Sequence, residues 1–343
     1  MRAKATGFRS GCLFKSDFPK VEEMQNFPDI RPPGRVPRVI VAGAVNMDLS
    51  GTPFRGLRPG DSNPGRVRLA PGGVGRNIAE NLARLGLSVS LLTILGDDLH
   101  GQMIREHSAR AGIDLSLSLT EPEASTSTYL CINEPDGDLH IAVSDMSIYD
   151  RLLPDRLEKL LPELNRADLV VMDANLPEET LVWLARQVQV PLAADPVSAA
   201  KASRLKSVLP RLTLLKPNVQ EAEILTGIRV RTPDDALSAA RALLDAGLRR
   251  VFLSLGPGGA LACGGDQEFR LPCYPAAVRN TTGCGDAFFS AVCDAFLRGM
   301  DLRDSALRGL AAAALCAQDE NAVPAALSQE ALSRFMNESA VQN

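Results

Sequence analysis

The chain has 343 residues, of which 45% are hydrophobic and 23% are charged, as in an ordinary globular protein with one large domain. The formal net charge of −4 gives no broad basic field, which argues against nucleic acid as a partner but leaves free nucleosides and sugars as candidates. The seven cysteines form no C-x-x-C pair and no apolar run reaches about 18 residues, so we expect no zinc site, no disulfide framework and no membrane partner.

We predict that residues 1–36 form a disordered leader ahead of a folded domain spanning 37–335, with a short tail at 336–343. The first 16 residues carry four basic side chains and no acidic one, which faintly resembles an organellar transit peptide. The unpaired cysteines favour a reducing compartment, so we expect a cytoplasmic protein, with organellar import as the alternative.

The first half of the folded region begins with alternating strands and helices. Apolar runs predict buried strands at 39–43 and 88–96, and apolar residues at helical spacing predict helices at 76–86 and 101–111.

The pattern then changes to extended segments with a tight turn. Two such segments, 126–133 and 138–144, flank E-P-D-G and predict a β-hairpin, while 61–70 also reads as extended. We therefore expect a small separate sheet with strands from about 48–70 and 125–145.

The second half returns to apolar strands separated by helical segments, such as the helix predicted at 235–246. The predicted strands are 168–172, 190–194, 212–215 and 250–255. This alternation predicts an α/β fold with three layers, in which helices cover both faces of a mostly parallel sheet. Ligands of such sheets bind at the carboxyl ends of the strands.

The sequence T-T-G-C-G-D at 281–286 precedes a predicted helix at 286–298. Gly283 and Gly285 allow close approach to a ligand, and the unpaired amides of a helix N-terminus attract phosphate. Asp286 would repel a resting phosphate, but it suits a general base for a hydroxyl that attacks phosphorus. The alternative is an ordinary turn in which Asp286 only caps the helix.

The sequence P-G-G-V-G-R-N at 71–77 also lies where a strand passes into a helix. Its glycines permit contact with a hydroxylated ligand, and Asn77 can donate and accept hydrogen bonds toward a diol. The alternative is a plain glycine loop. Neither G-x-G-x-x-G nor G-x-x-x-x-G-K-[ST] is present here, so the loop predicts neither a dinucleotide fold nor a P-loop.

Weaker signals follow three predicted strands. Asn46 and Asp48 could accept from sugar hydroxyls, and Asn218 and Glu221 could supply oxygens for magnesium. The glycines of 253–260 could lie beneath a nucleotide.

The order of these motifs resembles that of the PfkB, or ribokinase-like, family of carbohydrate and nucleoside kinases over about residues 38–330. Within the family, the sequence is most similar to the branch that phosphorylates pseudouridine. The segments that carry this likeness are G-G-V-G-R-N-I-A-E-N-L-A-R-L-G at 72–86, D-P-V-S-A-A-K at 195–201, L-K-P-N-V-Q-E-A-E at 215–223 and N-A-V-P-A-A-L-S at 321–328.

The resemblance implies a ribokinase-like three-layer fold with a small β-sheet lid, and ATP and Mg²⁺ as cofactors. Asp286 would activate a 5′-hydroxyl beside an anion hole formed by the amides of Gly283, Cys284 and Gly285. The implied ribose ligands are Asn46, Asp48, Gly72, Gly73 and Asn77. The implied ATP contacts are Asn218, Ser254, Gly256, Gly258, Gly259, Gly283 and Gly285. Asn218 and Glu221 would organise magnesium and its waters.

The resemblance also implies that the hairpin is a lid, which in this family often builds a homodimer. Thr128 and Asp145 would contact the substrate from this lid. Lys201 would lie near the base or the phosphates, unless it is a solvated helix lysine. Two departures matter: Val74 replaces the Lys of many sugar kinases, and Asn280 replaces the Asp of potassium-binding members, which argues against activation by K⁺.

The leading interpretation is therefore ATP-dependent phosphorylation of pseudouridine at its 5′-oxygen. One alternative is another sugar or nucleoside kinase, such as a ribokinase or an adenosine kinase. A second alternative is a catalytically idle regulator that binds a nucleoside, although the presence of Asp286 together with Gly283 and Gly285 favours an enzyme. A dehydrogenase is the least supported, because its dinucleotide fingerprint is missing.

Overall fold

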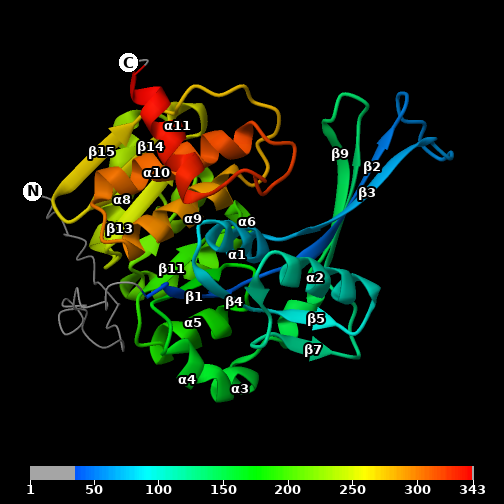
Figure 1. Cartoon of the computed structure of the whole chain (residues 1–343), viewed down its shortest axis with the longest axis horizontal. Helices are drawn as coiled ribbons and strands as arrows, with labels where there is room; N and C mark the ends of the chain where they lie inside the picture. The colour runs from blue at the N-terminus through cyan, green and yellow to red at the C-terminus, as the bar shows by residue number, and fades with distance from the viewer. Residues whose placement is uncertain (1–34, 342–343) are drawn as a thin grey trace, which may run out of the picture.

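A nine-stranded sheet runs through the centre of the protein, with helices on both faces (Figure 1). The computed structural model describes residues 35–341, so nearly all of the predicted leader lies outside the described part, and the expectations about its role and about localisation remain predictions. None of the helices within residues 35–341 is long and apolar enough to cross a membrane.

The large sheet is parallel except at one edge, where β14 pairs antiparallel with both of its neighbours. Its spatial order is β15 (Gln267–Leu271), β14 (Ala260–Gly264), β13 (Arg250–Ser254), β12 (Leu214–Leu215), β11 (Leu192–Asp195), β10 (Leu169–Asp173), β1 (Arg38–Ala42), β4 (Ser88–Leu92) and β6 (Ile113–Asp114). The parallel strands other than β6 had been predicted, whereas β6 and the edge hairpin β14–β15 had not.

Both faces of this sheet are buried, which explains why its strands are apolar throughout rather than alternating. Val39 and Val41 of β1 belong to one hydrophobic cluster, and Ile40 and Ala42 belong to the other. The first cluster includes α1 (Val74–Arg84), α9 (Cys284–Leu297) and α10 (Leu302–Ala317). The second includes α3 (Pro154–Leu157), α4 (Leu161–Leu164), α5 (Glu178–Gln187), α6 (Ala199–Ala202), α7 (Val219–Thr226) and α8 (Pro233–Asp245).

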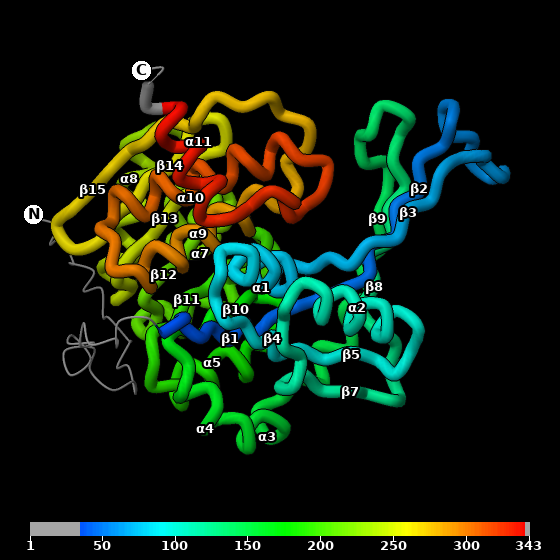
Figure 2. Tube along the Cα trace, viewed as in Figure 1, coloured from blue at the N-terminus to red at the C-terminus, as the bar shows by residue number. Residues whose placement is uncertain are grey.

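A separate four-stranded sheet extends away from the main body (Figure 2). Its order is β3 (Gly65–Gly72), β2 (Asn46–Pro53), β8 (Thr128–Asn133) and β9 (Leu139–Asp145). The predicted hairpin around E-P-D-G is confirmed as β8–β9. We call this four-stranded sheet the lid sheet.

Two element boundaries differ from expectation. The strand predicted at 88–96 is interrupted at Thr93, because β4 pairs in the large sheet while β5 (Ile94–Gly96) pairs with β7 (Leu119–Glu121). The last helix, α11 (Gln329–Val341), continues beyond residue 335, where the tail was predicted to begin, and packs against α9 and α10. Helix α2 (Leu99–Arg110) contacts the base of the lid sheet.

Charged side chains join the three C-terminal helices inside the protein. Asp294 of α9 is fully buried and accepts hydrogen bonds from Arg308 at 3.0 Å, Arg298 at 2.9 Å and Gln329 at 2.9 Å. A buried carboxylate is tolerated only while such donors surround it.

We expect Arg308→Met to lower the free energy of unfolding by about 3 kcal/mol, because it leaves part of the charge on Asp294 uncompensated in the interior. Chemical denaturation would measure this loss. The exposed Arg303 on the same helix provides the control, and Arg303→Met should change stability by less than about 0.5 kcal/mol. Equal effects of the two substitutions would contradict a stabilising role for the buried pair.

Candidate active site

The two glycine motifs meet although they lie far apart in the sequence. Asn77, in the first turn of α1, donates a hydrogen bond from Nδ2 to Oδ2 of Asp286, in the first turn of α9, at 2.8 Å and across 209 positions. Both side chains are buried. The two motifs therefore form one site, at the helix N-termini that follow them.

The start of α9 requires glycine for two separate reasons. Gly283 has a φ of 82°, and a Cβ there would overlap the carbonyl oxygen of Ala322. At Gly285, a Cβ would come within 2.9 Å of the Nζ atom of Lys216. Backbone without side chains therefore flanks Cys284 at this helix N-terminus, and the amide of Cys284 itself makes a turn bond of 3.3 Å to the carbonyl of Thr281.

The predicted ribose ligands also converge. Asn46 donates a hydrogen bond to Asp48, and a Cβ on Gly72 would overlap the Asp48 carboxylate. Gly73, with a φ of 98°, begins α1 against the end of β1. Burial raises the pKa of Asp48 despite the hydrogen bond from Asn46. Together with Asn77, these residues line the junction of the lid sheet and the main body.

Three buried charged residues at this site were missed by the sequence analysis. Asp173 and Asp195 end the neighbouring strands β10 and β11, and Lys216 follows β12. The Nζ atom of Lys216 lies 3.0 Å from Oδ2 of Asp195. Each of the three follows or ends an apolar strand, and that position was the signal that could have identified them.

These charges affect one another strongly because they are shielded from water. Burial raises the pKa of Asp286 to about 7, and the carboxylate of Asp195 adds to this shift against the opposing charge of Lys216. Burial alone would lower the pKa of Lys216, but the nearby carboxylates, led by Asp195, raise it. Burial raises the pKa of Asp173 to about 6. Asp286 can thus exchange a proton near neutral pH, as a general base requires.

The predicted nucleotide residues that follow β12 and β13 lie beside one another. Asn218 and Glu221 form a reciprocal cap at the start of α7, with hydrogen bonds of 2.8, 2.9 and 2.9 Å. Ser254 joins this cap, because its amide donates to the carbonyl of Pro217 at 2.9 Å. A short turn over Gly256–Gly258 follows, with Gly256 and Gly258 exposed and Gly259 buried against Leu271.

Magnesium fits this cap only through water. Each carboxylate oxygen of Glu221 already accepts a hydrogen bond from Asn218, and the side chain is buried. Carboxylate oxygens retain further acceptor capacity toward water bound to a metal. Within residues 35–341, no group of three or more His, Cys, Asp or Glu side chains could hold a metal ion alone.

The side chain of Asn280 is engaged within the protein. Its Oδ1 accepts from the amide of Thr282 at 2.9 Å, and its Nδ2 donates to the carbonyl of Glu320 at 3.1 Å. Both polar atoms of the Asn280 side chain are therefore engaged within the protein, and the expectation that K⁺ is not required stays a prediction.

The remaining predicted residues have partners outside the contact between Asn77 and Asp286. Lys201 is half-buried and donates to Oδ1 of Asn175, and burial lowers the pKa of Lys201. Thr128 and Asp145 pair with each other in the lid sheet. Strand alternation puts both on the face opposite Asp48, so the structure does not gather them with the ribose ligands.

Comparison with known proteins matches this geometry to a family. Residues 36–329 match the family described as pfkB family carbohydrate kinase. The chain is 35% identical over 270 residues to pseudouridine kinase of Escherichia coli (strain K12), covering 78% of this chain and 86% of that one. It is 28% identical over 276 residues to ribokinase of Bacillus subtilis (strain 168), covering 79% and 89%.

Solved structures show the same fold. A carbohydrate kinase from Agrobacterium tumefaciens superposes with a TM-score of 0.79 and 33% identity, covering 88% of this chain and 97% of that one. Arabidopsis thaliana ribokinase complexed with ribose and ATP has a TM-score of 0.79 and 23% identity, covering 88% and 99%. The chain belongs to the PfkB family, which confirms the predicted family and the ribokinase-like fold. It is a phosphotransferase of a family of carbohydrate and nucleoside kinases.

We expect Asp286→Asn to reduce kcat by about 10²–10⁴-fold, because the amide cannot accept a proton, while nucleoside affinity changes little. In the parent protein, kcat/KM should rise with pH around a midpoint near 7, since burial raises the pKa of Asp286 to about 7. Steady-state kinetics and calorimetric binding would measure both.

Stability provides an independent check on the same carboxyl group. The pKa of Asp286 in the folded state is near 7, above the ordinary value of 3.8, so the protonated carboxyl group favours the folded state at low pH. This stabilising contribution is lost as the pH rises from about 4 to 7. Asp286→Asn should therefore gain stability relative to the parent across this range. Equal losses of turnover and nucleoside binding, without this gain, would indicate a structural residue instead.

Proposed function

We propose that this protein transfers the γ-phosphoryl group of ATP to the 5′-hydroxyl of pseudouridine. The observation that carries the proposal is the hydrogen bond between Asn77 and Asp286 at 2.8 Å. This bond joins the motif at residues 71–77 to the N-terminus of α9. The carboxyl group of Asp286, whose pKa burial raises to about 7, lies at the junction. A reaction between a hydroxyl and an anionic group needs both halves at one point.

In the proposed reaction, Asp286 accepts the proton of the 5′-hydroxyl as its oxygen attacks the γ-phosphorus. The bond from that phosphorus to the ADP oxygen breaks, and ADP leaves. The amides of the first turn of α9, from Gly283 to Gly285, stabilise the charge on the transferred group. Asn46 and Asp48 hold the ribose hydroxyls in line. Magnesium bound through waters near Glu221 would neutralise phosphate charge.

A further relative supports pseudouridine as the substrate, and one residue argues against plain ribokinase. A second relative of that name, from Arabidopsis thaliana, is 24% identical over 349 residues, covering 83% of this chain and 92% of that one. Val74, where many sugar kinases have Lys, removes a fixed charge from the sugar side of the site. Pseudouridine has an additional ring N–H, and a site that accepts from it can reject uridine strongly.

We expect ADP release from ATP and Mg²⁺ with pseudouridine, at a kcat/KM at least about 10²-fold above that for uridine. A coupled assay would compare pseudouridine, uridine, adenosine, ribose and fructose 6-phosphate. Preferred turnover of ribose or adenosine would identify another kinase of the family. Tight nucleoside binding without turnover of any of these would identify a regulator.

We also propose that the lid sheet forms a homodimer. One of its faces is apolar and exposed, as the pairing register shows for residues that share that face. These residues are Val67, Leu69, Leu130, Ile141 and Val143, with exposed fractions of 71%, 47%, 44%, 57% and 62%. A contiguous apolar face of this kind is typical of an interaction surface.

We expect Val143→Asp to make the protein monomeric at concentrations where the parent is dimeric, because it would bury an unpaired charge between two lids. Light scattering after size exclusion would measure the mass. The matched control is Val278→Asp, at a valine that is 65% exposed but outside the lid sheet. A monomeric parent, or dissociation by both substitutions alike, would contradict the proposal.

A further inference from the structure

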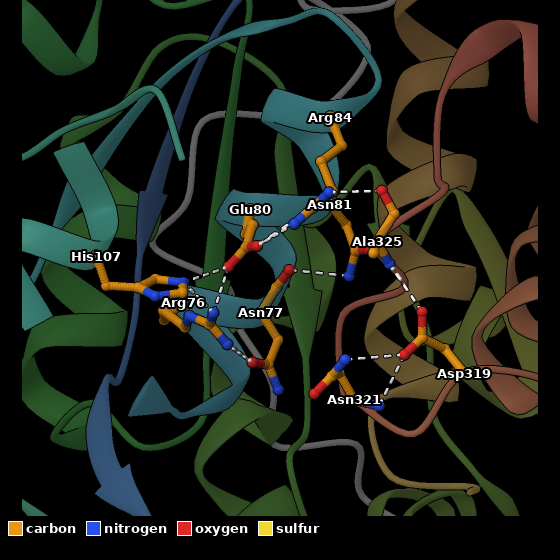
Figure 3. A network of polar contacts seen from close by, with 9 residues as sticks. All are labelled: Arg76, Asn77, Glu80, Asn81, Arg84, His107, Asp319, Asn321 and Ala325. Atoms are coloured by element: carbon orange, nitrogen blue, oxygen red, sulfur yellow. Dashed lines mark hydrogen bonds and ion pairs between the residues drawn. The ribbon is translucent and has the colours of Figure 1, made fainter. Parts of the chain in front are cut away.

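Arg76 is a buried cation beside the site, and neither the sequence motifs nor the proposed reaction assigns it a role. It precedes Asn77 in the first turn of α1 and is only 5% exposed. Figure 3 shows its guanidinium between Asn77 and Glu80, with His107 of α2 on its far side. Nη1 donates to Oδ1 of Asn77 at 2.8 Å, and Nη2 donates to the Glu80 carboxylate.

The direction of these hydrogen bonds decides how Asn77 is oriented. A guanidinium has donors only, so the atom of Asn77 that faces Arg76 must be the carbonyl oxygen. The amide nitrogen of Asn77 then faces Asp286 and donates to it at 2.8 Å. If the Asn77 amide were reversed, its Nδ2 would face the donors of Arg76, and its Oδ1 would face a carboxylate oxygen of Asp286. Arg76 therefore makes Asn77 a donor toward the proposed base.

Arg76 is itself held in place from the other end. Glu80 is 3% exposed, and Arg84 donates to its Oε1 at 2.8 and 3.2 Å. Burial alone would raise the pKa of Glu80, but the hydrogen bond to His107 and the charge of Arg76 lower it to about 2. Glu80 thus remains a permanent anion that anchors the guanidinium.

The hydrogen bonds of the Arg76 guanidinium to Asn77 and Glu80 are made by its two terminal nitrogens. Its Nε atom is buried and has no hydrogen-bond partner among the described residues. Leaving a donor on a charged group unpaired costs free energy, so the orientation is set by the contacts with Asn77 and Glu80. A cation needed only to neutralise Glu80 would not have to reach Asn77.

We propose that Arg76 is a positioning residue, which orients the Asn77 amide so that Asp286 is held ready to accept the substrate proton. The inference rests on the proposed function, in which Asp286 is the general base. Arg76 does not touch the reacting atoms. It acts through Asn77, because the charge-assisted bond at 2.8 Å excludes the other amide orientation.

The test is a double-mutant cycle in kcat with the full-length protein, ATP, Mg²⁺ and pseudouridine. We expect Arg76→Met to lower kcat by about 10²-fold, as small misplacements of a catalytic group do, with a smaller change in KM. In an Asn77→Leu background, the same substitution should cost less than about threefold, because the group it orients is gone. Additive losses in the cycle would overturn the proposal.

Two further variants separate positioning from charge and folding. Arg76→Lys keeps the charge but lacks the fork that reaches Asn77 and Glu80 together, so it should lose kcat like Arg76→Met. Full activity of Arg76→Lys would overturn the proposal. The matched control is Arg84→Met, since Arg84 shares Glu80 but contacts Ala325 instead of Asn77, and its kcat should stay within about twofold.

If Arg76→Met does not fold, Arg76→Met combined with Glu80→Gln removes both buried charges, and the same cycle applies against Glu80→Gln alone. Failure of the proposed function has a different signature. Asp286→Asn would then retain turnover, or no member of the substrate panel would be phosphorylated. An additive cycle in an enzyme that Asp286→Asn inactivates would overturn the role of Arg76 alone.

Discussion

The contact between Asn77 and Asp286 joins segments from opposite ends of the folded chain, and the site depends on it. Neither helix could supply both a sugar-side ligand and an anion hole. The central sheet brings them together, because Gly75 of α1 packs against Gly43 just after β1, and Gly285 of α9 lies beside Lys216 just after β12, a strand parallel to β1 in the same sheet. The two helices then direct their first turns toward a common point.

Buried charge is the second constraint on this region. Asp173, Asp195 and Asp286 would repel one another strongly in an interior that contained no cation. Lys216 lies among them with 8% of its side chain exposed. Burial and the neighbouring carboxylates raise the pKa of Asp286, and Lys216 opposes them. At neutral pH, Asp286 is therefore near the midpoint of its titration instead of fully protonated or fully ionised. The same burial that costs stability thus produces a group that can take up and release a proton.

Local sequence identified the features that depend on local chemistry. The helices behind both glycine motifs were predicted, because tight turns and helix N-termini have specific residue requirements, but each helix begins two residues earlier than expected, at Val74 and at Cys284. Asp173, Asp195 and Lys216 were missed because their proximity depends on the order of strands β10, β11 and β12, which no single segment determines. The inward direction of Arg76 likewise depends on α2, which supplies His107 from the other side.

The loop that precedes α11 packs against the first turn of α9. Asp319 organises this loop by accepting hydrogen bonds from Asn321 and Ala325 (Figure 3). The carbonyl oxygen of Ala322 occupies the space that a Cβ on Gly283 would need. A substitution that shifts this loop would therefore disturb the backbone of a glycine motif from outside that motif, so the tolerance of the loop to sequence change is tied to the geometry of α9.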